Sequence, residues 1–158
     1  MIIKKNLEKY YLNDIINKMK NIFIDTDVII DFLGNRASFS NAATELFDLY
    51  AHNNKKPFIS ANSYTNVYYL LNKLIKSPKI VISHLTTLYD LTELLEVNSN
   101  IINQSIHSEF SDFEDAVQYY AALSNKKIDL IVSRDKKGFK KSAIPVFDVE
   151  QALRICSQ

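Results

Sequence analysis

The sequence N-I-F-I-D-T-D-V-I-I-D-F-L, residues 21–33, combines a short strand, a polar turn and the start of a helix. Ile22, Phe23 and Ile24 are consecutive β-forming residues, as expected for a strand that is buried on both faces of a parallel sheet. The apolar residues of 28–33 then recur at helical intervals, so they predict a helix that packs back onto that sheet.

Two carboxylates separate this strand from this helix. Asp25 and Asp27 follow the strand directly, and ligands of open α/β sheets bind at the carboxyl ends of the strands. A carboxylate buried at this edge is costly unless it holds a cation or joins a hydrogen-bond network. We expect a cation here.

Strand and helix patterns alternate along the rest of the chain. Helices are predicted at 40–53, from 60 or 62 to about 71, at 77–89, from 98 or 99 to 110, at 112–122, and from 148 or 149 onward. Strands are predicted at 58–59, 91–97, 130–132 and 146–147. This alternation predicts an α/β fold with a parallel sheet. An amphipathic helical extension at 1–20 precedes the predicted domain at 21–158.

Composition limits the classes of function. The 158 residues include 19 basic and 18 acidic side chains, so any nucleic-acid contact must depend on a local patch. One cysteine, Cys156, excludes a disulfide framework and a thiolate metal site. Two glycines argue against a glycine-rich phosphate loop. No apolar run reaches the roughly 20 residues that span a bilayer, and no signal-peptide pattern begins the chain, so we expect a soluble, cytoplasmic protein.

Further carboxylates occur at equivalent positions. Asp112 and Asp115 lie three residues apart at a predicted helix start, and Asp135 follows the strand at 130–132. Carboxylates brought together at one edge must protonate or take up a cation. Oxygen ligands without cysteine or a suitably spaced histidine favour Mg²⁺ or Mn²⁺ over zinc.

These segments resemble the PIN domain family, specifically the toxin-like PIN ribonucleases of bacterial toxin-antitoxin systems. The resemblance is carried by I-D-T-D-V-I-I-D-F-L, I-S-A-N-S-Y-T-N-V-Y-Y-L-L, D-F-E-D-A-V-Q-Y-Y-A and I-V-S-R-D-K-K-G-F, in that order. It implies a Rossmann-like sheet of about five parallel strands with helices on both faces. It also implies hydrolysis of RNA at a Mg²⁺ or Mn²⁺ site formed by Asp25, Asp115 and Asp135.

Two positions depart from the family pattern. Asn66 stands where many members carry a glutamate, and Gly138 stands where related sequences often carry an aspartate. An amide oxygen can still bind Mg²⁺ or orient a water, so Asn66 remains a candidate site residue, but it brings no negative charge. We therefore expect weaker metal binding than in relatives that have the glutamate.

Other residues are assigned supporting roles. Asp112 is predicted to be either an outer-shell group or proton acceptor, or simply the N-cap of its helix. A basic run beside the expected site either contacts the RNA backbone or is a solvated turn; it comprises Arg134, Lys136, Lys137, Lys140 and Lys141. The resemblance implies an RNA substrate, a cognate antitoxin protein and a homodimer.

Two other functions fit parts of the same pattern. D-T-D-V after an apolar strand is similar to the nucleophile motif of haloacid-dehalogenase-like phosphatases, in which Asp25 would be the nucleophile and Asp27 the acid/base. Alternatively, the chain is a PIN-like scaffold that binds RNA or protein without cleaving RNA, because of the changes at Asn66 and Gly138.

Overall fold

Five parallel strands form one sheet at the centre of the computed structural model, which describes residues 19–156. The sheet has the order β3-β2-β1-β4-β5. Its strands are β1 (Ile22–Ile24), β2 (Phe58–Ser60), β3 (Glu93–Leu95), β4 (Leu130–Val132) and β5 (Val146–Phe147). The expected α/β architecture with five parallel strands is confirmed, and the strand that follows Asn21 occupies the middle of the sheet.

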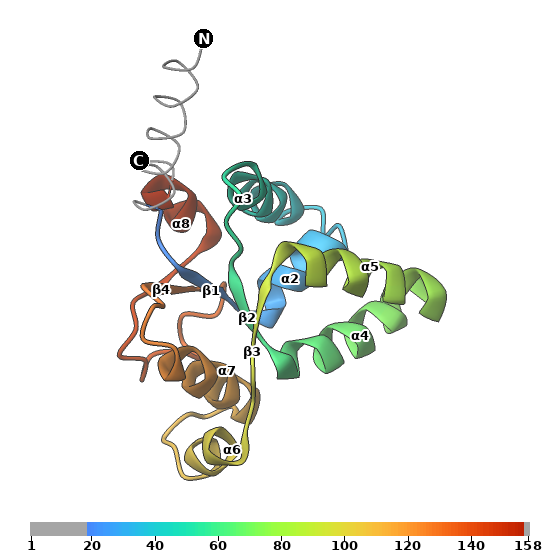
Figure 1. Cartoon of the computed structure of the whole chain (residues 1–158). Helices are drawn as coiled ribbons and strands as arrows, with labels where there is room; N and C mark the ends of the chain where they lie inside the picture. Colours follow the sequence, from blue (N-terminus) through green and yellow to red (C-terminus); the bar gives the residue numbers. More distant parts are fainter. Residues whose placement is uncertain (1–18, 157–158) are drawn as a thin grey trace, which may run out of the picture.

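Helices follow the strands and cover the sheet (Figure 1). They are α2 (Thr26–Leu33), α3 (Ser40–His52), α4 (Ala61–Ile75), α5 (Pro78–Leu91), α6 (Ser99–Ile106), α7 (Phe113–Ser124) and α8 (Val149–Cys156). No helix within residues 19–156 is long and apolar enough to cross a membrane.

Alternating side chains of the central strand point into two separate cores. Ile22 and Ile24 pack into a core with residues of α2, α3, α4, α5 and α8, whereas Phe23 packs into a second core with Tyr119 and Ala122 of α7. All three strand residues are fully buried. Burial on both faces explains why the strand is an uninterrupted apolar run rather than an alternating one.

Some predicted boundaries are wrong. The strand predicted at 91–97 contains only Glu93–Leu95, because α5 continues through Leu91 and the hydroxyl of Thr92 donates to the carbonyl of Leu88. This strand lies at the sheet edge and pairs only with β2, so fewer ladder bonds hold it. The helix expected to reach residue 110 ends at Ile106.

The helix predicted at 1–20 lies almost wholly outside the described residues. Only Met19 and Lys20 of that segment are described, and neither is helical. Met19 is buried in the core that contains Ile22 and Ile24. Met19, three residues before β1, is therefore part of the folded body.

Candidate active site

An acidic cleft of about 220 Å³ opens where the carboxyl ends of β1 and β4 meet the first turn of α7. Its lining residues are Asp25, Thr26, Asp27, Leu70, Asp112, Glu114, Asp115, Gln118 and Asp135. Five of these residues are the aspartates singled out from the sequence, and they come from three segments far apart in the chain. The parallel topology brings them together, because it delivers the ends of β1 and β4 to the same edge.

Asp25 is held on both carboxylate oxygens. The amide of Gln118 donates a hydrogen bond of 2.9 Å to Oδ1, and the hydroxyl of Ser133 donates one of 2.6 Å to Oδ2. The Asp25 residue is only 4% exposed. These two donors fix the rotamer of the carboxylate at the point where the central strand ends.

Burial changes the protonation of this group. It raises the pKa of Asp25 to about 6, against the lowering effect of the hydrogen bonds from Ser133 and Gln118. The negative charges of Asp27 and Glu114 raise that pKa further. Asp25 is thus an anion near neutral pH whose charge is only partly compensated by its neighbours.

Asp112 caps helix α7. Its Oδ1 accepts hydrogen bonds from the backbone N–H groups of Glu114, at 2.8 Å, and Asp115, at 3.2 Å. The N-cap alternative considered from the sequence is therefore observed, and the same residue also lines the cleft. By ordering the first helical turn, this cap sets the position of Asp115.

Asp115 is half-buried and surrounded by like charges. Burial raises its pKa to about 7, and the charges of Asp25, Asp112, Asp135 and Glu114 add to this shift. Mutual repulsion of this kind is relieved either by a proton or by a cation.

Asp135 organises the turn after β4. Its Oδ1 accepts from the backbone N–H groups of Lys137 and Gly138, both at 3.0 Å, and its own N–H donates to Ser133 Oγ at 3.0 Å. A Cβ atom at residue 138 would overlap Oδ2 of Asp115 and lie 3.1 Å from Oδ2 of Asp135. The two carboxylates therefore border the same glycine from opposite segments.

The donor set of the cleft suits a hard divalent cation. Its six acidic side chains supply oxygen ligands only, and the pKa values of Asp25 and Asp115 are raised first by burial and further by neighbouring carboxylates. Within residues 19–156, no group of three His, Cys, Asp or Glu side chains lies close enough together to hold a metal ion as the side chains stand. Mg²⁺ does not need such a cage, because it keeps several waters and uses one or two carboxylates.

Sequence reasoning missed two cleft residues. Gln118 lies one helical turn after Asp115, and its Oε1 also accepts from the backbone N–H of Thr26 at 3.1 Å. Glu114 lies within the D-F-E-D motif, and one of its carboxylate oxygens is buried without a hydrogen-bond partner. The helical spacing of three residues from Asp115 was the available signal for Gln118.

Asn66 is not among the residues that line the cleft. This half-buried residue is on α4, and the α4 residue that lines the cleft is Leu70, one turn later. The hydroxyl of Thr26, another cleft residue, donates to Ser63 Oγ on the same helix as Asn66.

The basic run divides into paired and unpaired side chains. Arg134 and Lys136 form ion pairs with Asp31 and Asp148, respectively, and Lys141 pairs with Glu109. Lys137 and Lys140 are exposed and have no side-chain partner within residues 19–156. Lys137 is also in the turn of the cleft residue Asp135, to which its backbone N–H donates a hydrogen bond.

Comparisons with known proteins agree with this architecture. A family model described as PIN domain matches residues 21–137. Ribonuclease VapC1 of Aquifex aeolicus is 26% identical over 137 residues, which cover 84% of this chain and 92% of that protein.

Solved structures share the fold. VapBC2 from Rickettsia felis, bound to a DNA fragment from its promoter, has a TM-score of 0.62 at 13% identity and covers 80% of this chain and 97% of that chain. PAE2754 from Pyrobaculum aerophilum has a TM-score of 0.62 at 16% identity, with coverage of 88% and 91%. VapC20 of Mycobacterium tuberculosis, a toxin that cleaves the sarcin-ricin loop, has a TM-score of 0.56 at 17% identity, with coverage of 70% and 87%.

Proposed function

This chain belongs to the PIN domain family, and from this membership we propose that it is a Mg²⁺- or Mn²⁺-dependent endoribonuclease, the toxin of a toxin-antitoxin pair. The observation that carries the proposal is the acidic cleft, where carboxylates from three segments share one volume. The similarity to a protein named as a ribonuclease supports RNA as the substrate. The phosphatase alternative has no support from the comparisons.

In this proposal Asp25, Asp115 and Asp135 hold the cation. A bound Mg²⁺ or Mn²⁺ would supply Lewis-acid polarisation of the phosphate and make a water more acidic. Gln118 and Ser133 donate hydrogen bonds to the two carboxylate oxygens of Asp25, so this side chain is already held in one rotamer before a cation binds. Asp135 is fixed in the same way by its turn amides, and its second oxygen faces Asp115 across Gly138.

Proton transfer and substrate binding fall to other residues. Glu114 stands beside Asp115 in the cleft and has one carboxylate oxygen without a hydrogen-bond partner, so it is the proton acceptor in this proposal. Lys137 and Lys140 are the cations available to hold RNA phosphates, since Arg134 is already engaged by Asp31 and Asp27.

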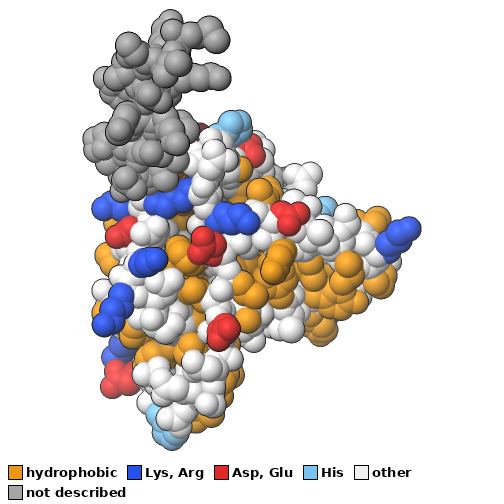
Figure 2. All heavy atoms as spheres, in the orientation of Figure 1, with side chains coloured by type: hydrophobic (Ala, Val, Ile, Leu, Met, Phe, Trp, Pro, Cys, Tyr) orange, Lys and Arg blue, Asp and Glu red, His pale blue; other side chains and the backbone are white. Residues whose placement is uncertain are grey.

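A protein partner is part of the proposal. The Rickettsia felis neighbour is a VapBC assembly, which supports a cognate antitoxin for this chain. Figure 2 shows apolar side chains gathered over the α4 and α5 region. The exposed members there are Tyr69, Leu74, Ile80, Ile82 and Tyr89. An apolar surface of this kind suits an antitoxin or a second copy of the chain.

The decisive experiment is RNA cleavage with matched variants. Wild type is expected to cut RNA in Mg²⁺ or Mn²⁺ but not in EDTA. Asp25→Asn, Asp115→Asn and Asp135→Asn should each abolish cleavage while circular dichroism stays unchanged. Asp48→Asn, at an exposed position on α3, is the control and should cut normally. A wild type that cleaves no RNA with either ion would leave the scaffold alternative in place.

A further inference from the structure

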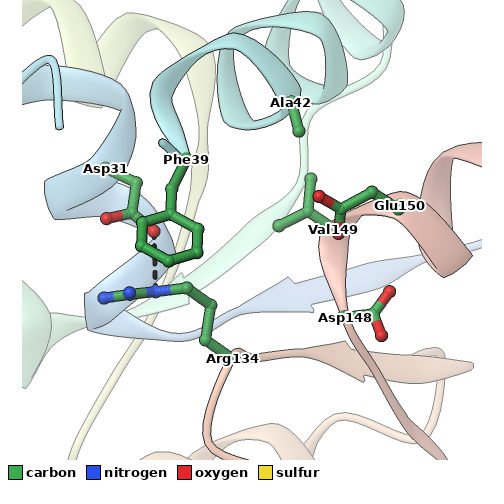
Figure 3. A pocket seen from close by; sticks show the side chains of 7 residues that line it. All are labelled: Asp31, Phe39, Ala42, Arg134, Asp148, Val149 and Glu150. Carbon is green, nitrogen blue, oxygen red and sulfur yellow. Dashed lines mark ion pairs between the residues drawn. The ribbon is translucent and has the colours of Figure 1, made fainter. Parts of the chain in front are cut away.

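A second cavity lies beside the acidic cleft, at the carboxyl ends of β4 and β5. It has a volume of about 380 Å³ and is lined by Asp31, Phe39, Arg134, Asp148, Val149 and Glu150, among others. In Figure 3 the ring of Phe39 and the guanidinium of Arg134 lie on one side of this cavity, and Val149 and Glu150 lie on the other. A cavity of this size accommodates a small organic group.

Arg134 separates this cavity from the cleft. Its Nε lies 2.8 Å from Oδ2 of Asp31, which lines the cavity, and its Nη2 lies 3.6 Å from Oδ2 of Asp27, which lines the cleft. Arg134 therefore contacts one residue of each site, and the two sites are neighbours on α2.

The walls of the cavity suit a flat ring. Phe39 is 43% exposed, and its ring centroid is 4.3 Å from Cζ of Arg134. The aromatic ring and the guanidinium plane are the surfaces on which bases of single-stranded RNA stack. Val149 adds an apolar contact on the opposite side.

The polar groups at the rim are hydrogen-bond acceptors. Asp148 is already committed, because its Oδ2 accepts from Lys136 Nζ and its Oδ1 accepts from the N–H of Gln151. Glu150 is exposed and has no partner among residues 19–156. Asp31 is fully buried at the base, where both oxygens lack a well-directed hydrogen bond despite the ion pair with Arg134. The site therefore presents carboxylates and no free cation, so it disfavours a phosphate.

We propose that this cavity binds the base of a nucleotide next to the cleaved phosphate, and that it prefers guanine. The inference depends on the proposed ribonuclease function. Guanine carries two adjacent donors on its Watson–Crick edge, N1–H and the N2 amino group, which match the two oxygens of one carboxylate such as Glu150. Uracil offers a single donor between two carbonyl oxygens, which a carboxylate repels. The cavity thus selects the sequence that the cleft cuts.

Binding of free nucleosides tests the cavity without any cleavage. Guanosine and uridine are titrated into metal-free wild type while the amide resonances of Phe39, Val149 and Glu150 are followed by NMR. Guanosine is expected to shift these resonances and uridine to shift them much less. Glu150→Gln should weaken guanosine binding about tenfold, and Phe39→Ala should weaken binding of both nucleosides. Glu45→Gln, the same change at an exposed position on α3, should have no effect.

Other outcomes overturn the proposal. Equal binding of the two nucleosides, or a guanosine affinity that is unchanged in Glu150→Gln, excludes base selection by this cavity. Shifts produced by argininamide but not by guanosine assign the cavity to a cationic side chain of a protein partner instead. Because this titration needs neither metal nor hydrolysis, its result is independent of whether the chain cleaves RNA.

A cleavage assay then tests whether the cavity determines which RNA sequence is cut at the cleft. RNA hexamers that differ at one base are cut by wild type, Glu150→Gln and Glu45→Gln, and the products are sequenced. Wild type and Glu45→Gln should prefer one fixed position occupied by guanosine, and Glu150→Gln should reduce that preference about tenfold. A preference that is unchanged in Glu150→Gln contradicts the inference, whereas a failure of all three proteins to cleave contradicts the proposed function alone.

Discussion

The carboxylate of Asp115 occupies the space that a side chain at Gly138 would fill. These residues come from α7 and from the turn after β4, and the contact places Asp115 against Asp135. We expect the absence of a Cβ here to be a requirement of the site.

Gly138→Ala tests this requirement. Gly138 does not have a positive φ, so alanine is compatible with the backbone, and the new Cβ collides mainly with Asp115 and also crowds Asp135. Rotation of Asp115 away from Asp135 should reduce RNA cleavage at least about tenfold, since small misplacements of a site residue have effects of this size or larger. Thermal unfolding is the control. The melting temperature should change little, because the carboxylate end of Asp115 can move at modest cost. Full activity in this variant would show that Asp115 need not lie beside Asp135.

The pH dependence of stability follows from the raised pKa of Asp115. Its folded-state pKa is about 7 and its ordinary value is 3.8, so its contribution to stability is fully present below about pH 4 and is lost as the pH rises through 7. Metal-free wild type should therefore lose stability relative to Asp115→Asn between pH 4 and 7. Urea unfolding at a series of pH values measures the difference. Asp48→Asn, at an exposed position outside the cleft, should follow wild type.

Metal binding should release protons near neutral pH. The cation needs carboxylates in their charged form, and the pKa values of Asp25 and Asp115 are about 6 and about 7. The affinity for Mn²⁺ is expected to rise as the pH increases through this range and to level off above about pH 8. Calorimetry at pH 6.5 in two buffers of different ionisation enthalpy should detect the released protons. An affinity that does not change with pH would exclude these carboxylates as the ligands.

Gln118→Leu should affect both stability and protonation. The residue is 1% exposed, and its loss leaves the N–H of Thr26 without its acceptor and Asp25 without one of its two donors. An unsatisfied buried donor costs about 1–3 kcal/mol, so the melting temperature should fall by several degrees. The pKa of Asp25 should rise, which moves the pH dependence of Mn²⁺ binding upward. Gln104→Leu at an exposed position on α6 is the matched control.

Lys137 and Lys140 should contribute to RNA binding through charge. Each is exposed beside the cleft, whereas Lys141 is paired with Glu109. In the Asp25→Asn background, Lys137→Ala and Lys140→Ala should each weaken binding of single-stranded RNA and lower the salt dependence by about one unit. Lys126→Ala, at an exposed position after α7, is the control. Salt slopes identical to that of the control would assign phosphate binding to another surface.

Local sequence patterns predicted the elements that carry the cleft. The apolar run at Ile22, Phe23 and Ile24 predicted a doubly buried strand because burial on both faces requires uninterrupted apolar residues. Asp112 predicted a helix start because the side chain of an N-cap residue accepts hydrogen bonds from backbone N–H groups two and three residues later in the chain. These interactions lie within one element or its cap, so neighbouring residues in the chain are sufficient to specify them.

The amino-acid sequence by itself determined the order of strands and helices, the edge at which the aspartates emerge, and the hard-oxygen character of the cleft. Only the tertiary structure decided that Gln118 reaches Asp25, 93 residues away, that Arg134 pairs with Asp31 and Asp27, and that Gly138 makes room for Asp115. The physical reason is the separation along the chain over which each kind of interaction acts. Periodicity and capping act over a few residues, whereas the contacts of a buried polar side chain depend on how distant elements pack.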